Sequence, residues 1–104
     1  MKYLTSALSL NMLGSFPASV DVREVSLEEA RRLAGDHKSL VGHPDTAVIF
    51  TGMLGVTVPF NRATIALEKG DVVLVGQYRG TRLPEGAKTL PEGATIQWLM
   101  VNVR

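Results

Sequence analysis

The sequence predicts a small α/β (α+β) domain, with a mixed β-sheet of five or more strands flanked by helices. Three observations support this class. The chain has 104 residues, which suffice for a single domain over residues 1–104 and not for two. A hydrophobic fraction of 45% and a charged fraction of 20% are typical of globular proteins and exclude disorder. Segments of alternating apolar and polar residues occur together with two segments that carry helix start and stop signals.

The N-terminal segment predicts a strand over about Lys2–Ala7, followed by a polar turn at Ser9-Leu10-Asn11. The stretch up to the small pair Ala18-Ser19 imitates a secretory signal peptide. Polar residues interrupt its apolar run, however, and the run is too short to cross a bilayer. We therefore expect a strand, no membrane partner and a cytoplasmic location.

The next segment predicts a strand at Val20–Val25 and a helix at Leu27–Ala34 that Gly35 ends. Ser26 and Glu29 have the spacing of a capping box. The Ser26 side chain would accept from the Glu29 amide, and Glu29 would reach back.

A second helix is expected to begin near Pro44, a residue type favoured at the first helical position, and to end at Gly55. Its expected buried stripe consists of Val48, Ile49, Met53 and Leu54.

The second half of the chain predicts three more strands. Asn61–Leu67 and Val72–Tyr78 would form a hairpin around the turn Glu68–Asp71, with the return strand central in the sheet. A loop rich in glycine and proline then leads to a last strand at Thr95–Val103.

Charge and cysteine content exclude several function classes. Eleven Lys and Arg against ten Asp and Glu give a net charge of +1, so a broad electrostatic grip on duplex DNA is not expected. The chain has no cysteine and two histidines, which excludes disulfides, thiol nucleophiles and a typical zinc site. We expect neither a metal nor a cofactor.

His43 is the first candidate for chemistry. It stands where the chain enters a helix, and the amides and positive dipole end there attract anions. A histidine beside a bound anion can protonate a leaving oxygen. The alternative is a histidine that only caps its own helix. His37 lies in a polar stretch and is expected to be exposed.

Arg82 and Glu85 are the second candidates, on a loop that Pro84 stiffens. An arginine fork suits phosphate oxygens, and a nearby carboxylate can orient the arginine or move a proton. The alternative is a surface ion pair. Arg62 is a third cation, and Ser9 and Asn11 could either contact a ligand or satisfy local backbone groups.

These pieces resemble the viral ring nucleases of the type III anti-CRISPR family over nearly the whole chain. The resemblance rests on four ordered motifs: Ser9-Leu10-Asn11-Met12-Leu13, Val41-Gly42-His43, Asn61-Arg62 and Arg82-Leu83-Pro84-Glu85-Gly86. That family degrades cyclic tetra-adenylate, the second messenger of type III CRISPR immunity. The resemblance implies a mixed sheet flanked by helices and a homodimer with the ring across its two-fold axis.

The resemblance also implies roles for individual residues. His43, Arg82 and Glu85 match the family's catalytic histidine and its phosphate-site arginine and glutamate. The expected ligand contacts are Ser9, Leu10, Asn11, Gly42 and Arg62. The sequence departs from the family at Asp45, where a small hydroxyl residue is usual, and at residues 88–95, which are too few for the helix found there in many members.

The implied activity is metal-independent cleavage of cyclic tetra-adenylate to linear di-adenylates with a 2′,3′-cyclic phosphate, in the host cytoplasm. RNA supplies its own nucleophile, the 2′-hydroxyl, so such a site needs only orientation, charge stabilisation and a proton donor. The alternative is a viral module that sequesters a cyclic nucleotide or binds another protein without catalysis.

Overall fold

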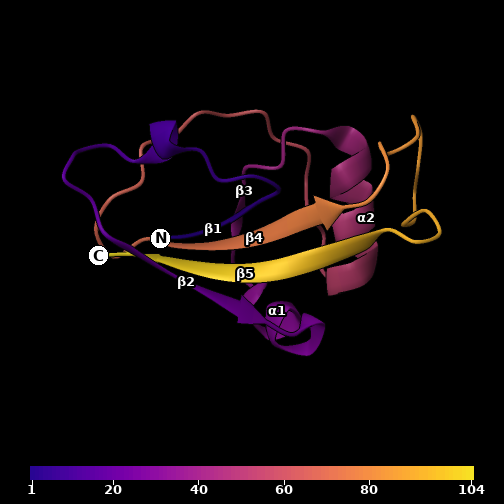
Figure 1. Ribbon diagram of the computed structural model, residues 1–104, viewed down its shortest axis with the longest axis horizontal. Coiled ribbons are helices and arrows are strands. Elements are labelled where there is room, and N and C mark those ends of the chain that lie inside the picture. The colour runs from indigo at the N-terminus through magenta and orange to yellow at the C-terminus, as the bar shows by residue number, and fades with distance from the viewer.

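A five-stranded sheet with the strand order β2-β5-β4-β1-β3 forms the centre of the computed structural model, which describes residues 1–104 (Figure 1). β1 runs parallel to β3 and β4, whereas β5 runs antiparallel to β4 and β2. The predicted mixed α+β fold is therefore confirmed. The strands are β1 (Lys2–Thr5), β2 (Val20–Val25), β3 (Lys38–Ser39), β4 (Val72–Arg79) and β5 (Thr95–Val103), and the helices are η1 (Leu10–Met12), α1 (Leu27–Leu33) and α2 (Pro44–Leu54).

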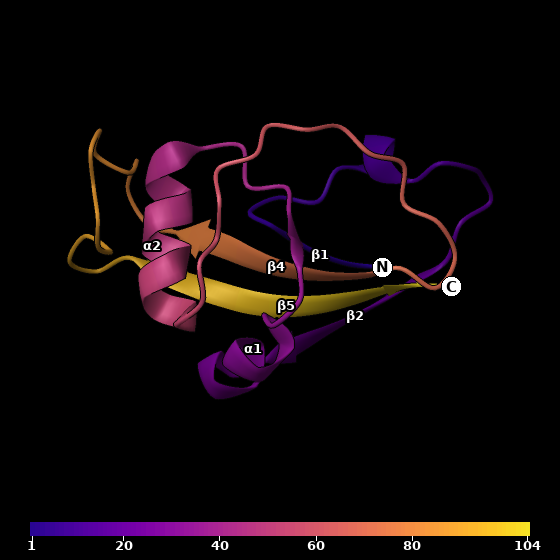
Figure 2. The same ribbon diagram turned by 180° about the vertical axis from the view of Figure 1, so that it is seen from behind.

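Alternate residues of β4 point to opposite faces of the sheet, and each face is covered by a different part of the chain. Leu74 packs in a cluster with residues of α1 and α2, among them Ala30 and Phe50. Val73 and Val75 pack in a second cluster, which the irregular segments around η1 and residues 61–67 cover. Figures 1 and 2 show α2 crossing one face of the sheet near the carboxyl end of β4.

The start of α1 matches the prediction only in part. The Ser26 hydroxyl accepts a hydrogen bond from the Glu29 amide at 3.1 Å, as expected. The Glu29 carboxylate does not return to the cap, because it pairs with Arg23 at 3.3 Å across to β2. The predicted reciprocal half of the capping box is therefore wrong.

The predicted strand at Asn61–Leu67, and with it the hairpin into β4, is also wrong. Both edges of β4 are already occupied, by β1 and β5. Residues 61–67 attach instead at their two ends, where the Asn61 amide donates to the Val41 carbonyl and Leu67 forms an isolated bridge with Leu13. The fifth strand is the short β3, which has no hydrophobic pattern of its own.

The buried stripe of α2 differs from the predicted one at two positions, because Met53 is only partly buried and Val48 is exposed. Val48 is 47% exposed, whereas Phe50 is fully buried. Helical spacing places Phe50 on the same side as Ala47 and Leu54, and it places Val48 away from them. The buried residues are Ala47, Ile49, Phe50 and Leu54.

Candidate functional site

His43 stands at the N-terminus of α2, and its side chain is not used to cap the helix. His43 has an extended backbone, with φ at −133°, and its side chain forms no capping hydrogen bond. Pro44 follows as the first helical residue. The first amides of a helix have no intrahelical partners and carry the positive end of its dipole. The exposed imidazole therefore stands beside a region that favours an anion.

The loop of residues 80–94, between β4 and β5, carries Arg82 and Glu85. Tyr78 donates its hydroxyl to the Thr81 carbonyl at 2.6 Å, which holds the start of the loop. Leu83 packs against the core cluster on the helical side of the sheet. With Leu83 directed inward, its neighbour Arg82 is left exposed to solvent.

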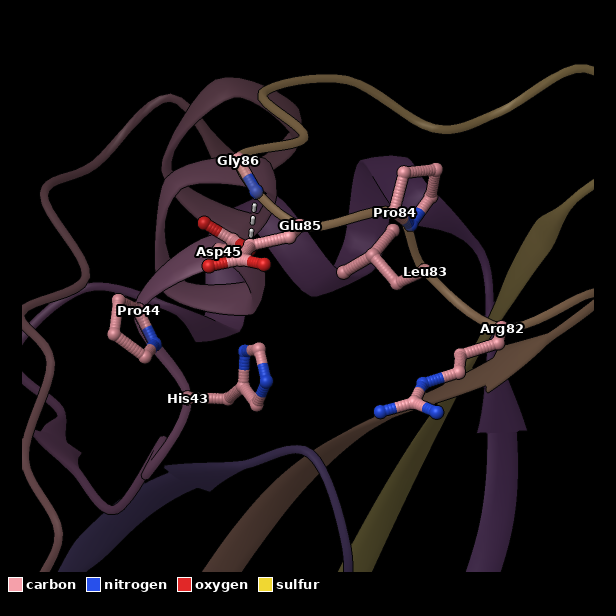
Figure 3. A pocket seen from close by; sticks show the side chains of 8 residues that line it. All are labelled: His43, Pro44, Asp45, Arg82, Leu83, Pro84, Glu85 and Gly86. Carbon is pink, nitrogen blue, oxygen red and sulfur yellow. Dashed lines mark hydrogen bonds between the residues drawn. The ribbon is translucent and has the colours of Figure 1, made fainter.

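These two segments enclose one open hollow of about 770 Å³. In Figure 3 the imidazole of His43 and the guanidinium of Arg82 point into the same open space from opposite sides. Arg82 and Glu85 form no ion pair with each other, since the ion pairs of the molecule involve other residues. The lining residues are His43, Pro44, Asp45, Arg82, Leu83, Pro84, Glu85 and Gly86.

One hydrogen bond joins the two sides of the hollow. The Gly86 amide donates to Asp45 Oδ2 at 2.8 Å, across 41 positions of sequence (Figure 3). The sequence drew attention to Asp45 only as a departure from the pattern of the ring nucleases. No local pattern announces a bond that spans so many residues, and only a covarying pair in related sequences could have indicated it.

Gly42 and Arg62, two predicted ligand contacts, lie together next to His43. A Cβ added to Gly42 would lie 3.7 Å from the Cα, Cβ and Cγ atoms of Arg62. The Asn61 side chain fixes this contact, because its amide donates to the Ser39 carbonyl at 2.7 Å. Arg62 therefore provides an exposed cation beside the segment that leads into the hollow.

Ser9, Leu10 and Asn11 are not brought to the hollow within one chain. They lie at η1, which Figures 1 and 2 show toward the opposite end of the long axis from α2. The Ser9 hydroxyl accepts from the Asn11 amide at 3.2 Å, so it satisfies the local backbone. Leu10 is 75% exposed.

His37 does not have the exposed environment that was expected. Its Nδ1 lies 2.6 Å from the Ala34 carbonyl oxygen, and its Nε2 is buried without a hydrogen-bond partner. The imidazole therefore belongs to the end of α1 rather than to the hollow.

The arrangement can bind an anion and move a proton. The hollow combines the guanidinium of Arg82, the imidazole of His43 at a helix N-terminus and the carboxylate of Glu85, all accessible from solvent. Groups of these kinds can hold a phosphodiester and protonate an oxygen that leaves it. None of the helices is long and apolar enough to cross a lipid bilayer.

Comparison with known proteins places the chain in a viral family. The family model described as STIV B116-like matches residues 2–96. The chain is 33% identical over 96 residues to uncharacterized protein 26 of the Sulfolobus islandicus filamentous virus (isolate Iceland/Hveragerdi), covering 88% of this chain and 80% of that protein. The solved structure of B116 of the Sulfolobus turreted icosahedral virus superimposes with a TM-score of 0.78 at 27% identity, covering 97% of each chain. The chain thus belongs to the STIV B116-like family of viral proteins.

Proposed function

We propose that this protein is a metal-independent ring nuclease that opens cyclic tetra-adenylate and so counters or switches off type III CRISPR signalling. The observation that carries the proposal is the convergence of His43 and Arg82 on one open hollow, from two elements far apart in sequence. Glu85 lies on the same loop as Arg82. The resemblance of these residues and their flanking motifs to the ring nucleases supports cyclic tetra-adenylate as the substrate.

The proposed chemistry is an in-line displacement at phosphorus. A ribose 2′-hydroxyl attacks the adjacent phosphodiester, and the bond from phosphorus to the 5′-oxygen breaks. The products carry a 2′,3′-cyclic phosphate and a free 5′-hydroxyl. His43 donates the proton to the leaving 5′-oxygen, Arg82 stabilises the charged phosphorane, and Glu85 orients Arg82 or accepts the proton of the 2′-hydroxyl.

A homodimer is part of the proposal. Two copies of the chain provide two hollows for a ring of four phosphodiesters, so two opposite bonds are cut and linear di-adenylates result. Gly42 directly precedes His43, and Arg62 lies against Gly42. Ser9, Leu10 and Asn11 contact the ligand only if the ring extends beyond the hollow as far as η1. Sedimentation should give twice the chain mass of 11.2 kDa.

The first experiment incubates the protein with cyclic tetra-adenylate in EDTA and follows the products by chromatography. His43→Ala should cut at least about 100-fold more slowly, the usual minimum for loss of a positioned proton donor, and should still bind the ring. Arg82→Ala should also be slow. Its matched control is Arg79→Ala, because Arg79 is exposed at the end of β4 and bonds Gln97 outside the hollow.

Three results would contradict the proposal. If the folded wild-type protein leaves the ring intact, it is not a ring nuclease. If His43→Ala cuts at the wild-type rate, the role of His43 is wrong. If the wild-type protein protects the ring stoichiometrically without turnover, the protein sequesters the nucleotide instead.

A further inference from the structure

The β4–β5 loop, residues 80–94, has a single hydrogen bond to α2. Its other attachments are the bond from the Tyr78 hydroxyl of β4 to the Thr81 carbonyl and the packing of Leu83, Ala87 and Leu90 against the core cluster on the helical side of the sheet. Its internal bonds are local turns, in which Ala87 donates to the Pro84 carbonyl and Ala94 donates to the Pro91 carbonyl. The bond from the Gly86 amide to Asp45 Oδ2, at 2.8 Å, is the one that joins the loop to α2. Since Arg82 and Glu85 lie on this loop and His43 directly precedes α2, this bond is the direct polar link between the two sides of the site.

The conformation of the turn determines whether this bond forms. Pro84 to Ala87 form a β-turn closed at 3.1 Å, and Gly86, its third residue, has a φ of +79°. A positive φ at the third position is the mark of a type II turn. Changing the turn type rotates the peptide between Glu85 and Gly86, which redirects the Gly86 N–H and moves the adjacent Glu85.

Asp45 lies on the element that presents His43. It is the second residue of α2, two positions after His43, and it is partly buried. An acidic residue in the first turn of a helix also stabilises the helix dipole, and that role requires only its charge. Here the carboxylate is directed at the loop, where Oδ2 accepts the Gly86 amide (Figure 3).

We propose that Asp45 is a positioning residue that fixes Arg82 and Glu85 opposite His43 by accepting the Gly86 amide. This inference rests on the proposed function for its catalytic part. Asp45 contacts the loop backbone and takes no part in proton transfer. Its role requires a hydrogen-bond acceptor at Oδ2, not a negative charge.

The test separates the hydrogen-bond acceptor of Asp45 from its negative charge. Asp45→Ala removes both, whereas Asp45→Asn removes the charge and keeps an acceptor oxygen in the same place. Glu28→Ala is the matched control, because Glu28 is an exposed first-turn carboxylate of α1 whose partner is Arg32 of the same helix, at 3.6 Å. The measurements are kcat and KM for cyclic tetra-adenylate and the amide hydrogen exchange of residues 80–94 without ligand.

Asp45→Ala should lower kcat about 10- to 100-fold, because a displacement near 1 Å at a reacting centre has effects of that size. Its loop amides should exchange at least tenfold faster than in the wild-type protein. Asp45→Asn should restore both quantities to within about threefold of wild type, as expected for a retained acceptor at a positioning site. Glu28→Ala should change neither.

Gly86→Ala tests the same bond from the loop and leaves α2 untouched. A Cβ at Gly86 meets nothing within 4 Å, so the substitution perturbs only the positive φ of +79°. This variant should lower kcat in the same direction as Asp45→Ala. It keeps the proposal testable if Asp45→Ala fails to fold.

Wild-type kcat and wild-type exchange in folded Asp45→Ala would overturn the proposal. Equal losses in Asp45→Asn and Asp45→Ala would also overturn it, because charge would then be the requirement. Failure of the proposed function is recognised separately, as an intact ring with the wild-type protein. Hydrogen exchange still shows in that case whether Asp45 holds the loop.

Discussion

His43 and Arg82 share a property that separates them from several other polar residues of this chain. The Ser9 and Ser26 hydroxyls accept backbone amides, and Arg23 pairs with Glu29. The His43 side chain forms no capping hydrogen bond, and Arg82 forms no ion pair. Residues that remain free of local partners, and that face one hollow, are available to a ligand.

At the same scale, Tyr3 gives a prediction about pH. Burial raises the pKa of the Tyr3 hydroxyl above its ordinary value of 10.0, and the negative charges of Asp71 and Glu68 raise it further. The native state therefore favours neutral Tyr3 more than the unfolded state does. Its contribution to stability is complete below pH 10 and is lost as the pH rises through the native pKa.

Urea denaturation of the wild-type protein and of Tyr3→Phe between pH 8 and about 11.5 measures this contribution, since the ordinary tyrosine pKa lies near 10. The difference in free energy of unfolding between the two proteins should be constant below pH 10. Above pH 10 the wild-type protein should lose stability relative to Tyr3→Phe. A difference that stays constant to the highest pH would show that Tyr3 ionises equally easily in both states.

Among the elements, α2 places the site, and its packing on the sheet depends on Gly76 in β4. Phe50 of α2 and Trp98 of β5 form a tilted aromatic pair with ring centroids 5.0 Å apart. A Cβ at Gly76 would lie 2.5 Å from Phe50 Cζ and 2.7 Å from Trp98 Cζ3. Gly76 is therefore required because two rings approach the backbone.

Gly76→Ala should lower the free energy of unfolding by about 1–3 kcal/mol, the usual cost of overpacking a core. Gly52→Ala is the matched control within α2, where the added Cβ meets nothing within 4 Å. It should raise stability by up to about 1 kcal/mol, because alanine is the better helix former. Equal effects of the two substitutions in chemical denaturation would contradict this account of the packing.

For the molecule as a whole, the net charge of +1 predicts that the ligand is held by few cations. Counterion release lowers the logarithm of the association constant by about 0.7 per contacted phosphate for each tenfold rise in salt. A ring of four phosphates should therefore give a slope no steeper than about −3 with catalytically inactive His43→Ala. A much steeper slope would mean that the overall field of the protein, not the hollow, holds the ring.

The sequence determined the elements whose signals are local. Alternation and turn residues indicated β2, β4 and β5, the serine cap indicated α1, and Pro44 with Gly55 bounded α2. It also singled out His43, Arg82 and Glu85, which the fold brings to one hollow. The predictions of these helices and strands succeeded because each depends on residues within a few positions of one another.

Only the tertiary structure decided how these elements combine. Residues 61–67 alternate like a strand, but β1 and β5 already occupy both edges of β4. The free edge of β1 pairs with the two-residue β3 instead. Ser9 satisfies its own turn, while Asp45 reaches Gly86 across 41 positions. The physical reason is that strand order and loop contacts are set by which surfaces the whole chain can bury together, and no short stretch of sequence contains that information.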